Sequence, residues 1–306
     1  VQDDLTVTDD ASVGGDLAVT GASTAASYNG ITSKTFGTGS IMIGDNATGT
    51  IDAANYNTGL GVDIYAALTT GDENTAIGAF SLGAVTTGRY NTGLGKGTLE
   101  ATTTADSNTA VGTNAMQSNT TGTLNTAVGA FALDANTTAN NNTAIGSSAL
   151  GANTTGADNT AVGNNALDTN TTGDNNVAVG KNALDDNTTG VDSVAVGRSA
   201  LESQTTGGDN VAIGHLALST LTTAGNNVAV GDRAMQASTS GENNVAVGTL
   251  ALDANTTGGS NVAVGRDALG ANTTASNNTA VGKSALLVNT TGHDNVSVGA
   301  NSLEAN

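Results

Sequence analysis

The sequence contains no cysteine, no tryptophan and no proline, and only 2% of its 306 residues are aromatic. The absence of cysteine excludes disulfide bonds and thiolate metal sites, but it leaves the cellular compartment open, since many extracellular fibres contain none. The scarcity of large side chains leaves too little material for the thick cores of two ordinary globular domains. We therefore expect an elongated body with a thin core.

Positive charge and long apolar runs are also scarce. Eight basic residues stand against 27 acidic ones, which gives a formal net charge of −19. This balance argues against binding to a nucleic-acid backbone or to an anionic membrane surface. No run of 18 apolar residues is present, so we expect no insertion into a membrane.

What the sequence does contain is a 17-residue repeat. A pentapeptide of the form Asn-Val/Thr-Ala-Val/Ile-Gly, or a near variant of it, recurs sixteen times without insertion or deletion and ends on glycines from Gly44 to Gly299. A fixed period is typical of a solenoid, in which each repeat stacks on the previous one. Disorder is the competing interpretation of this composition, but it would not place Val, Ile and Leu at strict intervals. The sequence thus predicts a stem with short β repeats at 1–39 and a solenoid at 40–306, whose last repeat is incomplete.

Within the repeat, numbered 1 to 17 from its Asn, large and small residues alternate, as in Asn176 to Gly180. Positions 2 and 4 are β-branched in nearly every copy, and this period of two predicts a short strand with both side chains in the interior. Ala-Leu at positions 8 and 9 closes the core from the opposite side, and Asn-Thr-Thr-Gly at positions 12 to 15 favours a second bend. The prediction is a flattened coil with two short strands per turn, stacked in parallel about 4.8 Å apart.

Two positions carry a clear structural signature. The invariant glycine of position 5 predicts a bend that needs positive φ or leaves no room for a Cβ. Representative turn glycines are Gly78, Gly112, Gly146, Gly180, Gly214, Gly248 and Gly282. The Asn of position 1 predicts a ladder of stacked carboxamides, with a ligand-binding Asn row as the functional alternative. Representative ladder residues are Asn108, Asn142, Asn176, Asn210, Asn244 and Asn278.

Position 3 is Ala, Gly or Ser in every copy except Met42. If positions 2 and 4 face the interior, position 3 lies on the outer face, where a freely solvated surface would accept Lys, Glu or Gln. A row of small residues there predicts that another surface approaches closely, and the economical partner is a further copy of this chain. The predicted interchain face contains Ala110, Ala144, Ala178, Ala212, Ala246 and Ala280.

Charged and aromatic residues give no sign of a catalytic or metal site. Most basic residues fall at positions 6 or 7, and acidic residues collect at positions 10, 16 and 17. We interpret them as a solvated edge, because the nonapeptide pattern of calcium-loaded β-rolls is missing. His215 and His293 have no companions at ligand spacing, and no Ser-His-Asp arrangement or phosphate loop recurs, so we expect no catalytic residue, cofactor or metal.

Large apolar residues at position 7 are expected to pack on a neighbouring chain, with receptor contact as the alternative: Phe80, Phe131, Leu216 and Leu250.

The units that end in Val-Ala-Val-Gly, such as 210–214 and 244–248, resemble the head repeats of trimeric autotransporter adhesins. This resemblance implies a left-handed parallel β-roll in a side-by-side homotrimer, although the repeats of that family are usually shorter by about one bend. The longer unit, with Ala-Leu-x-x-Asn-Thr-Thr-Gly as in 149–156, is similar to the repeat arrays of bacteriophage tail-fibre proteins that carry a C-terminal self-cleaving chaperone domain. The Leu-Thr-Val-Thr and Leu-Ala-Val-Thr segments near the start are similar to such fibres too.

The resemblance implies a non-enzymatic structural fibre, extracellular, on a virion or a bacterial surface. The partners expected are the chain's own copies and a cell-surface receptor, for which a glycan is one candidate. The first alternative is the head of a bacterial surface adhesin. The second is an ice-binding solenoid, prompted by the paired threonines of positions 13 and 14, although adjacent side chains on a strand point to opposite faces. A sequence that starts at Val1 without a signal peptide and stops at Asn306 without a cap is expected to belong to a longer or processed polypeptide.

Overall fold

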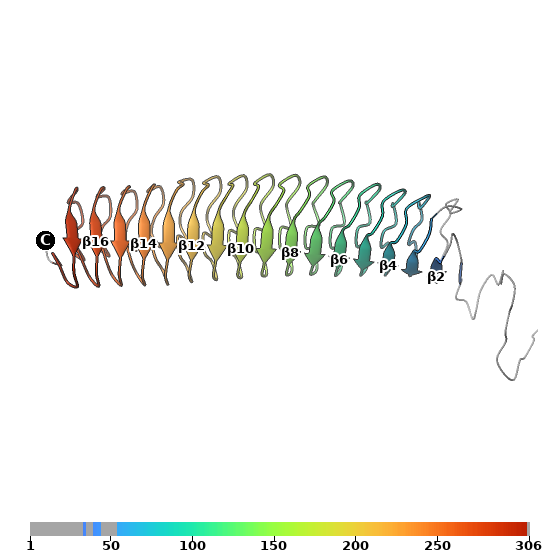
Figure 1. The fold of residues 1–306 in the computed structure, drawn as a ribbon, viewed down its shortest axis with the longest axis horizontal. Coiled ribbons are helices and arrows are strands. Elements are labelled where there is room, and N and C mark those ends of the chain that lie inside the picture. Colours follow the sequence, from blue (N-terminus) through green and yellow to red (C-terminus); the bar gives the residue numbers. More distant parts are fainter. Residues whose placement is uncertain (1–32, 35–38, 44–53, 305–306) are drawn as a thin grey trace, which may run out of the picture.

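The computed structural model describes residues 33–34, 39–43 and 54–304, which form one 17-stranded sheet. β1 (Ser33–Lys34) pairs antiparallel with β2 (Ile41–Ile43). From β2 to β17 every strand has three residues, and consecutive strands pair in parallel one repeat apart. Figure 1 shows the result, a rod of stacked turns whose strands lie side by side and point the same way.

The strands occupy positions 2 to 4 of successive repeats. After β2 they are β3 (Thr58–Leu60), β4 (Thr75–Ile77), β5 (Thr92–Leu94), β6 (Thr109–Val111), β7 (Thr126–Val128), β8 (Thr143–Ile145), β9 (Thr160–Val162), β10 (Val177–Val179), β11 (Val194–Val196), β12 (Val211–Ile213), β13 (Val228–Val230), β14 (Val245–Val247), β15 (Val262–Val264), β16 (Thr279–Val281) and β17 (Val296–Val298).

The register of the sheet matches the period of the sequence. Val177 pairs with Val194 and Ala178 with Ala195, a step of one whole repeat. The predicted all-β parallel solenoid of 17-residue turns is therefore confirmed. The predicted stem at 1–39 lies almost wholly outside the described residues.

Each described turn holds one strand, so the prediction of two strands per turn is wrong. Residues at positions 7, 9 and 17 have positive φ, for example 56° at Asn182, 53° at Leu184 and 54° at Asp192. These left-handed residues interrupt extended geometry, yet the backbone still bonds to its neighbours. Leu184 N donates to Ala200 O at 3.0 Å, and Thr188 N donates to Thr205 O at 2.9 Å. Ladder bonds thus continue around the coil without a second strand.

The two faces of the strand are the reverse of the prediction. In β10 the central Ala178 is buried, while Val177 and Val179 are only half-buried and lie on the outside. Ala183 and Leu184, at positions 8 and 9, are fully buried with it. The core of an ordinary turn therefore contains two alanines and one leucine, and the prediction that positions 2 and 4 fill the interior is wrong.

The reason is the narrowness of the coil, which two glycines at position 3 show directly. A Cβ on Gly59 would lie 2.6 Å from Cδ1 of Ile64, and a Cβ on Gly93 would lie 2.8 Å from Oγ1 of Thr98. Ile64 and Thr98 stand at position 8, where most turns have Ala. Position 3 loses its methyl group where position 8 gains bulk, so the two positions share one small space.

Candidate functional site

The turn glycines have the backbone geometry that their invariance requires. From Gly61 to Gly299, every glycine of position 5 has φ between 123° and 152°, a region open in practice only to glycine. A Cβ on Gly180 would also lie 2.4 Å from the carbonyl oxygen of Gly197 in the next turn. Both reasons given for the glycine therefore hold at the same residue.

The asparagines of position 1 form a buried ladder. The backbone N–H of Asn176 donates to Oδ1 of Asn159 at 2.9 Å, and its Nδ2 donates to the carbonyl of Gly190 at 2.8 Å. In other turns the carboxamides also bond each other, as at 3.3 Å from Nδ2 of Asn244 to Oδ1 of Asn227. These amides are buried and bonded within the chain, which favours the structural role over ligand binding.

A second ladder, at position 12, was missed from the sequence. Nδ2 of Asn187 donates to Oδ1 of Asn170 at 2.9 Å and to the Gly190 carbonyl at 3.0 Å. The same carbonyl accepts from Asn176, so both ladders meet at position 15. Its signal in the sequence is the recurrence of Asn three residues before a Gly or Ala, a pattern that by itself predicts only a bend.

The alanines of position 3 do not form an interchain face, so that prediction is wrong. All of them are fully buried inside their own chain, packed against positions 8 and 9 for the reason given above. The residues concerned are Ala110, Ala144, Ala178, Ala212, Ala246 and Ala280.

The outer face of the sheet is instead made by positions 2 and 4. Position 4 is Val, Ile or Leu in every strand from β2 to β17, and position 2 is Thr, Val or Ile. No charged residue occurs at either position, although the chain has 35 charged residues, 27 acidic and eight basic. In the interior of the rod these side chains remain partly accessible, for example to 41% at Ile145 and 37% at Val247. Position 2 is Thr in eight of these sixteen strands, so the face consists of an unbroken aliphatic row at position 4 beside a row that is Thr or aliphatic.

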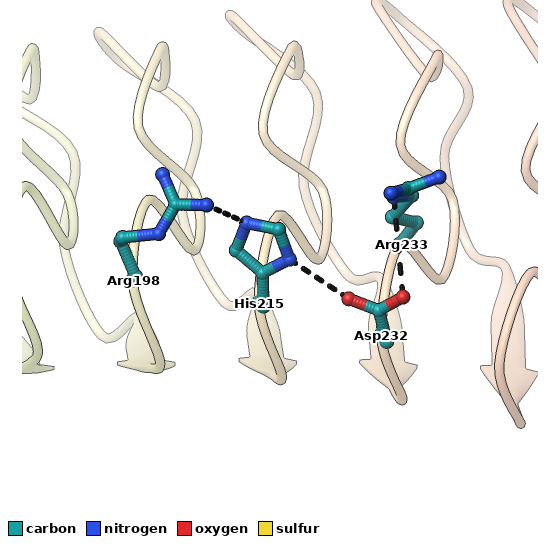
Figure 2. Close-up of polar contacts among 4 residues, drawn as sticks. All are labelled: Arg198, His215, Asp232 and Arg233. Atoms are coloured by element: carbon teal, nitrogen blue, oxygen red, sulfur yellow. Dashed lines mark hydrogen bonds and ion pairs between the residues drawn. The ribbon is translucent and has the colours of Figure 1, made fainter.

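His215 does have companions, contrary to the sequence interpretation. Figure 2 shows Arg198, His215 and Asp232 on three successive turns, with Arg233 beside Asp232. Nδ1 of His215 lies 2.8 Å from Oδ1 of Asp232, and the Arg198 guanidinium bonds Nε2 of the same ring. Because both ring nitrogens are engaged, the histidine offers no free general base. The relevant contact spacing in this fold is 17 residues, which makes the cluster a surface row of side chains joined by hydrogen bonds and, at Asp232 and Arg233, by an ion pair.

Carboxylates of positions 10 and 16 have distinct environments. At position 10, burial raises the pKa of Asp134, Asp168 and Asp253, and it raises that of Asp185 to about 6, with further contributions from Asp168, Asp186 and Glu202. At position 16 the side chain caps a backbone N–H of the preceding turn. Examples are Asp72 with Asn55 N at 2.8 Å and Asp174 with Ala157 N at 2.7 Å.

Within the described ranges, no group of three or more His, Cys, Asp or Glu side chains is arranged to hold a metal ion. The same part of the chain contains no helix long and apolar enough to cross a membrane. No protein-family model matches this chain, and no curated protein matches it.

Proposed function

We propose that this chain is a non-enzymatic structural segment of an extracellular fibre, the shaft of a phage tail fibre or similar virion appendage that mediates host attachment. In this proposal three copies pack side by side as left-handed coils. The receptor, with a glycan as one candidate, is contacted by the assembled fibre. The observation that carries the proposal is the charge-free outer face, with its unbroken row of Val, Ile and Leu at position 4, on a rod of constant pitch.

The size of this face suits an interface between copies. Fifteen steps of about 4.8 Å give a length of roughly 70 Å, and a three-residue strand is about 10 Å wide. The face therefore covers about 700 Å² per chain, so three chains that bury this face against one another remove about 2,100 Å² in total, above the roughly 1,600 Å² of a standard interface. Copies with the same pitch can cover it along its whole length.

A bacterial trimeric adhesin head has the same architecture and remains the alternative, since its β-roll would use the same face. The ice-binding alternative gains no support from the paired threonines. The hydroxyl of Thr188 at position 13 donates to the carbonyl of Thr205 at 2.9 Å, so it is engaged within the chain.

The test places charge on the outer face. Light scattering should give three times the 29.6 kDa chain mass for the unaltered protein. The variant Val196→Lys with Val230→Lys, both at position 4, should give a monomeric or polydisperse mass. The matched control is Thr206→Lys with Ser240→Lys, which adds the same charge to exposed residues of the same two repeats and should remain trimeric. A monomeric unaltered protein at micromolar concentration would remove the proposal.

A further inference from the structure

Two rims border the outer face. Positions 16 and 17 precede each strand and form what we call the acidic rim, and positions 6 and 7 follow it and form the basic rim. Because every turn repeats the same order, each rim runs along one long edge of the face.

The two rims carry opposite charge. Nine acids and one base occupy the acidic rim: Asp72, Glu73, Asp106, Asp158, Asp174, Asp192, Asp209, Glu242 and Asp294, with Arg89. Among the described residues, six bases and three acids occupy the basic rim: Lys96, Lys181, Arg198, Arg233, Arg266 and Lys283, with Asp63, Asp232 and Asp267. In a chain of net charge −19, the placement of six of the eight basic residues on one rim calls for a physical cause.

The ion pairs within the chain do not provide that cause. Asp232 pairs with His215 and Arg233, and Asp267 pairs with Arg266 at 3.2 Å, all within the basic rim. Over the described part of the chain, Lys181 and Arg198 have no carboxylate within ion-pair distance, and Asp192 has no cation. Opposite charges on the two rims are thus held apart by the width of the strand.

Two successive strands have an acid at the start and a cationic residue at the end. Asp174 precedes and Lys181 follows β10, and Asp192 precedes and Arg198 follows β11. Each pair therefore lies at one level of the rod, on opposite edges of the apolar face.

Symmetry decides which rims meet when copies cover this face. If the rods run in parallel about a rotation axis along their length, the end of each strand faces the start of a strand in the neighbouring copy, so basic meets acidic. If two rods run antiparallel, face to face, equivalent rims meet and like charges are brought together. We infer that the copies associate in parallel and without axial stagger, with Lys181 and Arg198 of one chain against Asp174 and Asp192 of the next. This inference rests on the self-association proposed above and adds its polarity and register.

Charge reversal tests the rim pairing. Lys181→Glu with Arg198→Glu should raise the dissociation constant of the assembly about tenfold or more, since two attractive contacts per interface become repulsive. Adding Asp174→Lys and Asp192→Lys to the same chain should restore the affinity. The matched control is Lys96→Glu with Lys283→Glu, the same change at position 6, after strands that are preceded at position 16 by Arg89 and Ser276 instead of an acid; it should not weaken the assembly.

The outcomes separate the two proposals. If the unaltered chain is a monomer, self-association itself is wrong. If it associates but the fourfold swap stays as weak as the double reversal, or the control weakens the assembly equally, only the rim pairing is wrong.

The relative direction of the copies can also be determined by cross-linking, because the chain has no cysteine and introduced cysteines would be the only thiols. A chain with Arg198→Cys and Asp192→Cys, treated with a short bis-maleimide, should form cross-links between residue 198 of one copy and residue 192 of another. Peptide mapping that finds only links between identical residues would overturn the parallel arrangement.

Discussion

Ser193 and Gln204 form a natural compensation that can be tested by a double-mutant cycle. Ser193 replaces the Asn of position 1, and in the same repeat Gln204 replaces the Asn of position 12. The longer Gln204 side chain crosses to the first ladder, where its Nε2 donates to Oγ of Ser193 at 3.2 Å and its Oε1 accepts from Nδ2 of Asn210 at 2.9 Å. Both side chains are fully buried, so neither can exchange its partner for water.

The structure fixes the expected magnitudes. Gln204→Asn withdraws the amide from Ser193 and Asn210 and should cost about 1 to 3 kcal/mol for the buried polar groups, plus about 0.8 kcal/mol for the methylene. Ser193→Asn alone places a second carboxamide in space that Gln204 fills, and overpacking should cost about 1 to 3 kcal/mol. The double variant recreates the arrangement of Asn176 and Asn187 in the preceding repeat, so its cost should be close to zero. The favourable coupling should therefore equal the sum of the two single costs, about 3 to 7 kcal/mol.

Urea unfolding followed by circular dichroism gives the free energies, and hydrogen exchange of peptides covering 190–212 shows whether the loss is local, as expected for a stack of repeats. A control cycle pairs Ser193→Asn with Ser238→Ala, whose side chains share no hydrogen bond, and should be additive. If the Ser193 and Gln204 changes also add within about 0.5 kcal/mol, the proposed compensation is refuted.

Three further predictions follow from single residues. Gly180→Ala should destabilise the rod by several kcal/mol, because φ at Gly180 is 140° and the new Cβ would lie 2.4 Å from the Gly197 carbonyl oxygen. Urea unfolding measures this decrease in the free energy of unfolding. Ser238→Ala should be neutral or stabilising by about 1 kcal/mol in the same assay, because the buried hydroxyl has no hydrogen-bond partner. The folded-state pKa of Asp185, about 6, exceeds the unfolded value, so the free energy of unfolding should fall as pH rises from about 4 to 6 and level off above. Asp185→Asn should raise Tm at pH 7 and flatten this pH dependence. An unchanged pH profile would contradict the assignment.

The sequence was sufficient for the period, the parallel stacking, the glycine bend and the first Asn ladder, because each of these depends on a residue type that recurs at fixed spacing. It was insufficient for the two faces of the strand. An alternation of period two is compatible with either positions 2 and 4 or position 3 facing the interior, and the larger side chains at positions 2 and 4 favour the wrong choice. A glycine at position 3 accompanies a larger residue at position 8 in two repeats, Gly59 with Ile64 and Gly93 with Thr98. These pairs indicate that position 3 faces the interior, since a larger residue at position 8 requires a smaller one at position 3 only if the two positions are in contact.

The number of strands per turn could not be predicted for a different reason. Positive φ at position 17 was detectable, because Asn and Asp predominate there and tolerate the left-handed region. Leucine at position 9, as in Leu184, has no such preference and gives no warning of its φ of 53°. That conformation is fixed by packing and by bonds between turns. Contacts such as the one between His215 and Asp232 were missed because their separation was compared with ligand motifs rather than with the repeat length.

Position 4 on the outer face is chemically more restricted than position 8 in the core, and this contrast is the strongest argument for the proposed interface. Buried position 8 accepts Ala, Ser, Thr and Ile, whereas accessible position 4 accepts only Val, Ile and Leu in all sixteen strands from β2 to β17. Strand propensity does not account for this, because Thr is common at position 2 but absent from position 4, and Leu60 and Leu94 are not β-branched. The property retained at position 4 is therefore apolarity. An accessible surface has no need of it unless another surface removes it from water, and a partner that does so over every turn must share the pitch of the rod.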